Sequence, residues 1–174
     1  MRLTNACRKL KVFVEKKIIV GNVCFLQDKR RGKVLLLHRN NEPMQYMSTG
    51  VGGKTEFHED IHLSCHREVF EETGLVPMNV RLKGVLKTIE EGGSSSWILF
   101  VYSAETFSDE IHACNEGKLE WVSLRDLHSQ NIVGFIRRVL PHVLDDTVFF
   151  EGTIVHDVKG NVFSDTIKLY TQTS

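Results

Sequence analysis

The chain has 174 residues, of which 41% are hydrophobic and 25% are charged, a composition that excludes the disordered and fibrous classes. Its length suits one domain, which we expect to span residues 1–174. The charges of the 22 basic and 22 acidic side chains cancel, which disfavours nucleic-acid and membrane partners. We also expect the protein to be a monomer or a homodimer.

The first elements are predicted to be strands joined by polar turns. We expect strands at 12–15, 17–26 and 34–38. The second is almost continuously apolar, as in a strand whose two faces are both covered. The polar turn at 27–33 predicts a hairpin between the second and third strands, and residues 40–47 read as a loop.

A loop rich in glycine, at 50–53, then leads into a helix. The run 61–72 contains neither Gly nor Pro, which favours an uninterrupted helix. Glu59 and Asp60 suit the positive end of its dipole. Gly74 stands where a C-terminal cap belongs, so this helix is bounded at both ends.

The second half predicts further strands and one more helix. Strands at 80–90 and 97–104 form a hairpin, and a short strand follows at 119–122. The segment 124–144 has apolar residues near helical spacing, and Pro141 is expected to end or kink that helix. A C-terminal β-hairpin is expected at about 147–170, with strands at 148–156 and 162–170. This order predicts an α/β fold in which a mixed sheet is sandwiched between helices.

The cysteines indicate a reducing compartment. They are far apart and form no Cys-x-x-Cys pair, which disfavours zinc knuckles and redox dithiols: Cys7, Cys24, Cys65 and Cys114. The charged N-terminal stretch lacks the apolar core of a signal peptide. We therefore expect a cytoplasmic protein.

Three carboxylates of the helix at 61–72 attract a cation. Glu68, Glu71 and Glu72 stand at i, i+3 and i+4, where like charges repel by roughly 0.2 to 0.5 kcal/mol per pair. Mg²⁺ prefers oxygen ligands and commonly links one or two carboxylates to substrate phosphates. The pattern alone also fits a solvated acidic face with an ordinary salt bridge.

The spacing around these acids is specific. Within the 23 residues from Gly53 to Leu75, five residues separate Gly53 from Glu59, and seven separate Glu59 from the Arg67-Glu68 pair. The remaining matching positions are Val69, Glu71, Glu72, Gly74 and Leu75. This pattern resembles the signature of the Nudix hydrolase family and implies a Nudix fold. His58 departs from it, because the family often has Gly at that position.

The resemblance implies roles for these residues. Glu68, Glu71 and Glu72 would be ligands of Mg²⁺ or Mn²⁺, with the carbonyl of Gly53 as a further ligand, and Glu71 and Glu72 would take part in catalysis. Arg67 keeps its proton, so we interpret it as the structural partner that holds Glu59.

Outside the signature, the segments 50–54, 114–126 and 145–170 resemble the bacterial 8-oxo-dGTP diphosphatase branch. This resemblance implies that Glu116 is an additional ligand or general base, with an ordinary loop acid as the alternative. Arg39 and Lys54 are candidates for binding substrate phosphates, or else solvated surface charges. Asn131 and Phe135 are the candidates for contact with the base, although Phe135 also fits the core.

The implied reaction is Mg²⁺-dependent hydrolysis of a nucleoside triphosphate, such as 8-oxo-dGTP, to the monophosphate and pyrophosphate. The alternatives are removal of pyrophosphate from RNA 5′ ends, cleavage of nucleotide sugars or dinucleoside polyphosphates, and a non-catalytic nucleotide-binding module. The small-molecule nucleotide is thus the expected partner.

Two other motifs overlap the signature stretch. Gly53-Lys54-Thr55 resembles the end of a P-loop, but Ser48 occupies the position of its first glycine, so we reject that motif. His58, His62 and His66 recur every four residues and form either a metal-binding row or, as we favour, an exposed one.

Overall fold

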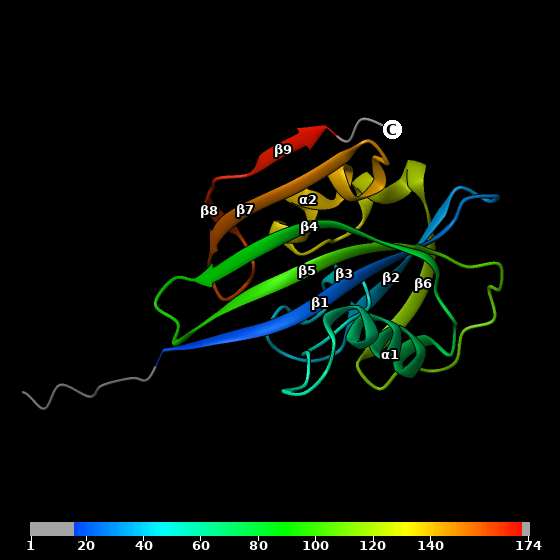
Figure 1. The fold of residues 1–174 in the computed structure, drawn as a ribbon, viewed down its shortest axis with the longest axis horizontal. Coiled ribbons are helices and arrows are strands. Elements are labelled where there is room, and N and C mark those ends of the chain that lie inside the picture. The colour runs from blue at the N-terminus through cyan, green and yellow to red at the C-terminus, as the bar shows by residue number, and fades with distance from the viewer. Residues whose placement is uncertain (1–15, 172–174) are drawn as a thin grey trace, which may run out of the picture.

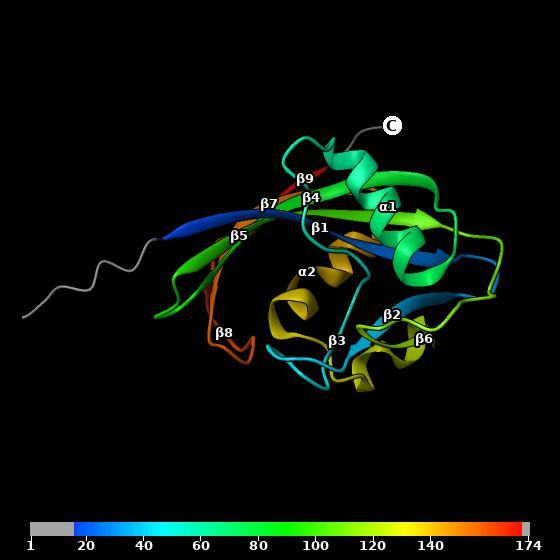
Figure 2. The same cartoon turned by 90° about the horizontal axis from the view of Figure 1, so that it is seen from below.

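The computed structural model describes residues 16–171, so the strand expected at 12–15 lies outside the described part. Its nine strands form one mixed sheet in the order β3-β2-β1-β5-β4-β7-β8, with β6 paired to β2 and β9 paired to β7 (Figure 1). Helices α1 and α2 lie on opposite sides of this sheet (Figure 2). The strands are β1 (Lys17–Asp28), β2 (Lys33–Arg39), β3 (Ser48–Thr49), β4 (Met78–Glu90), β5 (Ser95–Glu105), β6 (Gly117–Ser123), β7 (Val148–His156), β8 (Val162–Asp165) and β9 (Lys168–Thr171).

Strand β1 is central and has covered faces where it meets the helices. Val23 and Phe25 belong to the core cluster that includes α2, whereas Cys24 and Leu26 belong to the cluster that includes α1. This alternation explains why the strand is apolar at successive positions. The expected mixed sheet sandwiched between helices is confirmed.

The hairpin expected between β1 and β2 exists only beside its turn. The two strands pair at Gln27 with Val34 and at Asp28 with Lys33. Beyond that point β1 pairs in parallel with β5 over 17–27, and β2 pairs antiparallel with β6. The two strands thus separate, and the loop at 50–54 contacts β1 on the side that β2 leaves free.

Helix α1 (Ile61–Thr73) confirms the helix predicted at 61–72. The carboxylate of Asp60 accepts hydrogen bonds from the backbone N–H groups of His62 and Leu63, which otherwise lack partners at a helix start. Gly74 ends the helix with φ of 75°, a left-handed conformation in which glycine is favoured. The local signals therefore set both ends.

The single helix expected over 124–144 is wrong in its first half. A short 3₁₀ helix, Leu124–Ser129, is followed by an extended segment and then by α2 (Gly134–Leu144). The extended segment pairs with β3, because Ser48 N–H donates to the carbonyl of Asn131 and Val133 N–H donates to the carbonyl of Ser48. These sheet-like bonds replace helical ones. Pro141 does not end α2, which continues to Leu144.

The C-terminal segment completes the sheet. Strand β7 lies parallel to β4 and pairs antiparallel with both β8 and β9. The single strand expected at 162–170 is interrupted at Thr166 and Ile167, where Thr166 N–H bonds to the carbonyl of Thr153 outside the regular ladder. Within residues 16–171, no helix combines the length and apolar character needed to cross a membrane.

Candidate active site

The loop at 50–54 lies against β1 and faces α1. Asn22 N–H donates to the carbonyl of Gly53 at 2.9 Å, and the Asn22 side chain donates to Ser64 of α1. A Cβ atom at Gly53 would lie only 2.6 Å from Glu68 Oε1, so a larger residue would fill the space beside this carboxylate. The loop and the helix thus meet where Gly53 lies against the carboxylate of Glu68.

Arg67 fixes the geometry of this loop. Its Nε and Nη2 atoms donate to the two carboxylate oxygens of Glu59 at 2.7 and 2.9 Å, and Nη2 also donates to the carbonyl of Lys54. The guanidinium lowers the pKa of Glu59 to about 2, and the pKa of Arg67 is itself raised by this pairing. Arg67 therefore links α1 to the end of the loop at Lys54 and to Glu59, which lies just before the helix.

Glu72 is a buried carboxylate with an unpartnered oxygen. Its Oε2 atom accepts a hydrogen bond from Gly52 N–H at 2.9 Å, while its Oε1 atom has no hydrogen-bond partner. The pKa of Glu72 is raised to about 8, chiefly by burial and also by the nearby carboxylates of Glu116 and Glu68, although the hydrogen bond from Gly52 opposes this rise. The pKa of Glu68 is raised as well, chiefly by burial. Ionisation of Glu72 and Glu68 is therefore energetically unfavourable in the absence of a cation.

Glu71 differs from its neighbours in the signature. Its side chain is 58% exposed, and its Oε2 atom accepts from Arg67 Nη1 at 3.0 Å. The same Nη1 atom donates to Glu68 Oε1 at 2.9 Å. In this arrangement, no three His, Cys, Asp or Glu side chains of residues 16–171 surround one point closely enough to ligate an ion. The donors nevertheless suit a hard divalent cation, because they are oxygen atoms and one of them is buried without a partner.

A cavity of about 500 Å³ opens beside these carboxylates. Glu68 and Glu116 line it together with Arg39, Lys54 and Phe135. Glu116, which the sequence places outside the helix, is therefore brought to the same site. Phe135 is also part of the core, so it belongs to the cavity wall and to the core together, and its contact with a base stays a prediction.

Asn131 is the one proposed base contact that does not line the cavity. Its side-chain amide donates to the carbonyl of Tyr46 at 3.2 Å, and the residue is exposed. The reason is the extended segment before α2, which turns Asn131 towards the loop at 40–47 and away from the position that a continuous helix would give it.

Sequence reasoning missed several residues of the cavity. Trp97 of β5 lines it, and Lys54 Nζ lies 5.8 Å from the centre of the Trp97 ring. His156 of β7 lines it too, with its ring centre 4.8 Å from that of Phe135 and the two rings tilted by 37°, and Glu90 of β4 is a further lining residue. Only Asn22 carried a signal, since it is a polar residue inside an apolar strand.

The NUDIX domain model matches residues 16–143. The chain belongs to the Nudix family. Its match to an uncharacterised Nudix hydrolase, YvcI of Bacillus subtilis, is 30% identical over 128 residues, which is 71% of this chain and 79% of that protein. The structure is also similar to that of a MutT protein from Bacillus halodurans, with a TM-score of 0.75, 28% identity, and coverage of 86% of this chain and 97% of the other.

A third relative is an ADP-ribose pyrophosphatase of Methanocaldococcus jannaschii. It is 26% identical over 121 residues, which cover 69% of this chain and 69% of that protein. The Nudix fold and membership of the hydrolase family are thus established for this chain. The Nudix signature lies on the loop and on α1, where Arg67 donates to Glu68 and Gly52 donates to Glu72.

Proposed function

We propose that this Nudix hydrolase cleaves a phosphoanhydride bond of a nucleoside triphosphate, with an oxidised purine such as 8-oxo-dGTP as the preferred substrate. The products are the nucleoside monophosphate and pyrophosphate. The observation that carries this proposal is the lining of one cavity by carboxylates, by the cations Arg39 and Lys54, and by the aromatic rings of Trp97 and Phe135. Such a lining matches the phosphates and the base of one nucleotide.

The carboxylates fit a divalent cation, for which Mg²⁺ is the first candidate and Mn²⁺ the second. Glu68 and Glu72 would hold it, with the Gly53 carbonyl, Glu71 and Glu116 as the further donors. When bound, such an ion neutralises the phosphate charge, polarises the phosphoryl group and lowers the pKa of a bound water. Glu71 would first have to leave Arg67, since their ion pair turns it away from the cavity.

The other side chains supply orientation and proton transfer. Glu116 approaches from a loop outside α1 and lies near both Glu68 and Glu72, which makes it the best placed group to accept a proton from the attacking water. Arg39 and Lys54 would bind phosphate oxygens of the substrate. Trp97 offers an aromatic face for stacking with a base, a role for which Asn131 is poorly placed.

ADP-ribose is the second candidate substrate. It shares a purine and a phosphoanhydride with the first, and one relative is named an ADP-ribose pyrophosphatase. The similarity to a MutT protein over 97% of that protein favours the triphosphate. A module that only binds nucleotides is disfavoured, because the signature carboxylates and Arg67 are all present and Glu68 and Glu116 line the cavity.

The test is hydrolysis of a substrate panel with Mg²⁺ and with a chelator. The panel contains 8-oxo-dGTP, dGTP, ADP-ribose and RNA carrying a 5′-triphosphate, and released pyrophosphate or phosphate is measured. We expect the largest kcat/KM for 8-oxo-dGTP and no turnover in the chelator. Equal kcat/KM for dGTP and 8-oxo-dGTP would reject the base preference, a larger value for ADP-ribose or RNA would reject the triphosphate, and nucleotide binding without turnover of any substrate would reject the enzyme.

A further inference from the structure

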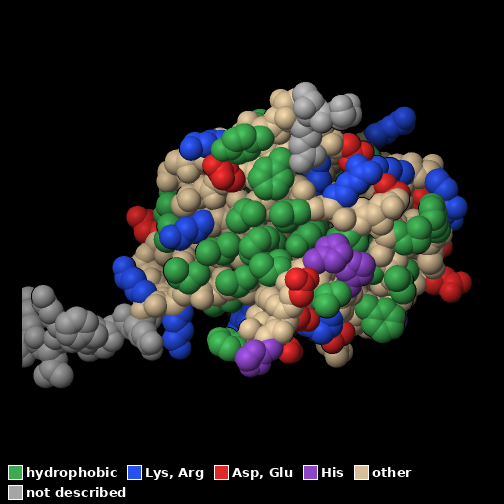
Figure 3. Space-filling model, in the orientation of Figure 1, with side chains coloured by type: hydrophobic (Ala, Val, Ile, Leu, Met, Phe, Trp, Pro, Cys, Tyr) green, Lys and Arg blue, Asp and Glu red, His purple; other side chains and the backbone are tan. Residues whose placement is uncertain are grey.

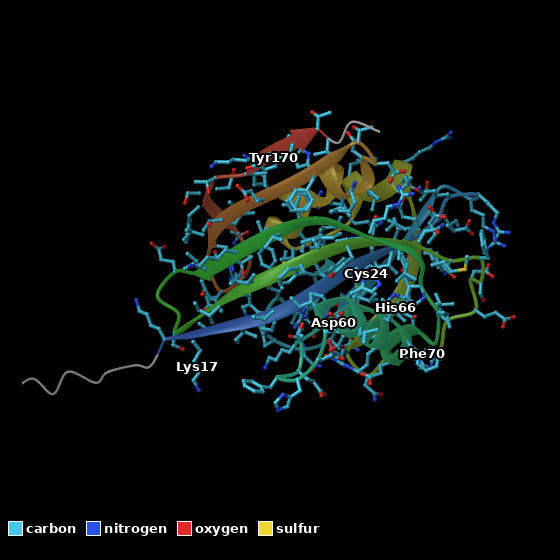
Figure 4. The ribbon with its side chains drawn as sticks, viewed as in Figure 1. Lys17, Cys24, Asp60, His66, Phe70 and Tyr170 are labelled. Carbon is cyan, nitrogen blue, oxygen red and sulfur yellow. The ribbon has the colours of Figure 1, made fainter. Side chains whose placement is uncertain are left out.

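Two histidines form a close pair on α1. His62 and His66 are one helical turn apart, and their Nε2 atoms lie 3.2 Å from each other. His62 is exposed and His66 is partly exposed. Figure 3 shows histidine side chains in two separate places on this surface, and Figure 4 places His66 on α1 at the larger of the two. The pair is thus accessible from solvent.

The histidine pair is separate from the carboxylate site. His62 and Glu68 are six positions apart, which corresponds to about 240° around an α-helix. The carboxylates of Glu68 and Glu72 turn towards the loop at 50–54. The ring of His62 instead lies 6.1 Å from the ring of Tyr102, on β5. Two different faces of the same helix therefore carry oxygen donors and nitrogen donors.

The distance between the two Nε2 atoms suits a shared metal ion. Zinc binds imidazole nitrogen at about 2.0 to 2.1 Å, so two nitrogens 3.2 Å apart subtend an angle of about 100° to 106° at the ion. This angle is close to that of a tetrahedral site. In the metal-free pair, one Nε2–H group donates to the Nε2 atom of the other ring, so the two nitrogens are already neighbours, and a small rotation of the rings would direct both at one ion.

The helix holds the two rings in place. Asp60 caps the first turn through the N–H groups of His62 and Leu63 at 2.9 and 3.0 Å. An i, i+4 spacing on a regular helix fixes the separation of the two side chains, and two histidines at this spacing are a known zinc-binding arrangement. Imidazole prefers zinc, copper and nickel, whereas magnesium prefers oxygen.

We propose that His62 and His66 form a second metal site, which binds one divalent transition-metal ion of the Zn²⁺ class with water at its remaining positions. The bound ion links two successive turns of the helix that carries the Nudix carboxylates, and it thereby stabilises the start of α1. This site does not depend on the proposed substrate or on hydrolysis.

The test uses the full chain, freed of metal and then supplied with excess Mg²⁺ to occupy oxygen sites. Zn²⁺ alone is titrated in, and binding is followed by calorimetry and by the ¹⁵N resonances of the histidine side chains. We expect the Nε2 resonances of His62 and His66 to shift together in the wild-type protein. This measurement needs no variant.

Substitutions then assign the site. Loss of a supporting group outside the ligand shell already weakens metal sites by about 10 to 100-fold. His62→Gln and His66→Gln, which each remove a ligand, are therefore expected to weaken Zn²⁺ binding at least tenfold. His58→Gln is the matched control, because this exposed histidine lies before α1 and its ring is next to Phe57.

Several results would overturn the proposal. These are Zn²⁺ shifts confined to other histidines, unchanged affinity in both variants, or an equal loss of affinity in the His58→Gln control. Thermal unfolding in a chelator establishes that each variant is folded. Failure of the substrate panel leaves these measurements unaffected, so the two proposals are tested separately.

Discussion

Replacement of Glu72 by Gln is expected to separate activity from stability. The Gly52 N–H group keeps an acceptor in Glu72→Gln, and the new amide N–H group can occupy the place of the unpartnered Oε1 atom. The substitution removes a buried negative charge without leaving a cavity. We expect the turnover number to fall at least about 100-fold, in the range of lost acid–base or metal-ligand groups.

The same variant is expected to be more stable than the wild type when metal is absent. The pKa of Glu72 is raised from 4.5 to about 8, and each pKa unit corresponds to about 1.36 kcal/mol. Ionised Glu72 therefore costs up to about 5 kcal/mol above pH 8, and relaxation of the site reduces this value. We expect a gain of at least about 1 kcal/mol, which raises Tm by about 2 to 4 °C in a protein of this size.

The sign of the pH dependence gives the sharpest check. The folded protein holds the proton of Glu72 more tightly than the unfolded chain, so the wild type loses stability as pH rises from about 4.5 to about 8. The advantage of Glu72→Gln should therefore be small near pH 4.5 and largest above pH 8.

Thermal unfolding in a chelator across this pH range is the assay. Glu71→Gln, on the exposed side of α1, is the control and should keep the pH dependence of the wild type. A Glu72→Gln variant with equal or lower Tm above pH 8 would refute the reasoning from burial. Excess Mg²⁺ should raise the Tm of the wild type more than that of the variant, since the bound ion stabilises the ionised carboxylate.

Two further substitutions test the cavity and the cap of α1. Trp97→Ala should raise KM about 5- to 150-fold with little change in kcat, because stacking on an aromatic ring contributes roughly 1 to 3 kcal/mol per base. Steady-state kinetics on the best substrate measures this change, and an unchanged KM would remove Trp97 from the base site. Gly74→Ala should lower the free energy of unfolding by about 1 kcal/mol, because φ at this position is 75° and alanine is strained in that conformation. Urea unfolding measures the loss. A variant as stable as the wild type would show that the backbone at position 74 imposes no such strain.

Local signals in the sequence determined the site-bearing helix and the family. Asp60 and Gly74 set the ends of α1 through short-range hydrogen bonds and a left-handed backbone, which depend on few neighbours. The spacing from Gly53 to Leu75 likewise lies in one continuous stretch. These features could be predicted because loop, cap and helix are neighbours along the chain.

Contacts between distant strands decided the remaining features. Asn131 is extended because β3 pairs with the segment before α2, and no local pattern shows that edge. Trp97 and His156 reach the cavity because β5 and β7 lie on either side of β4 in the sheet. A strand has two nearly equivalent edges for pairing, and its choice of neighbour depends on packing across the whole core. The sequence by itself therefore determined the chemistry of the Nudix loop and helix, whereas the tertiary structure decided which side chains surround the substrate cavity.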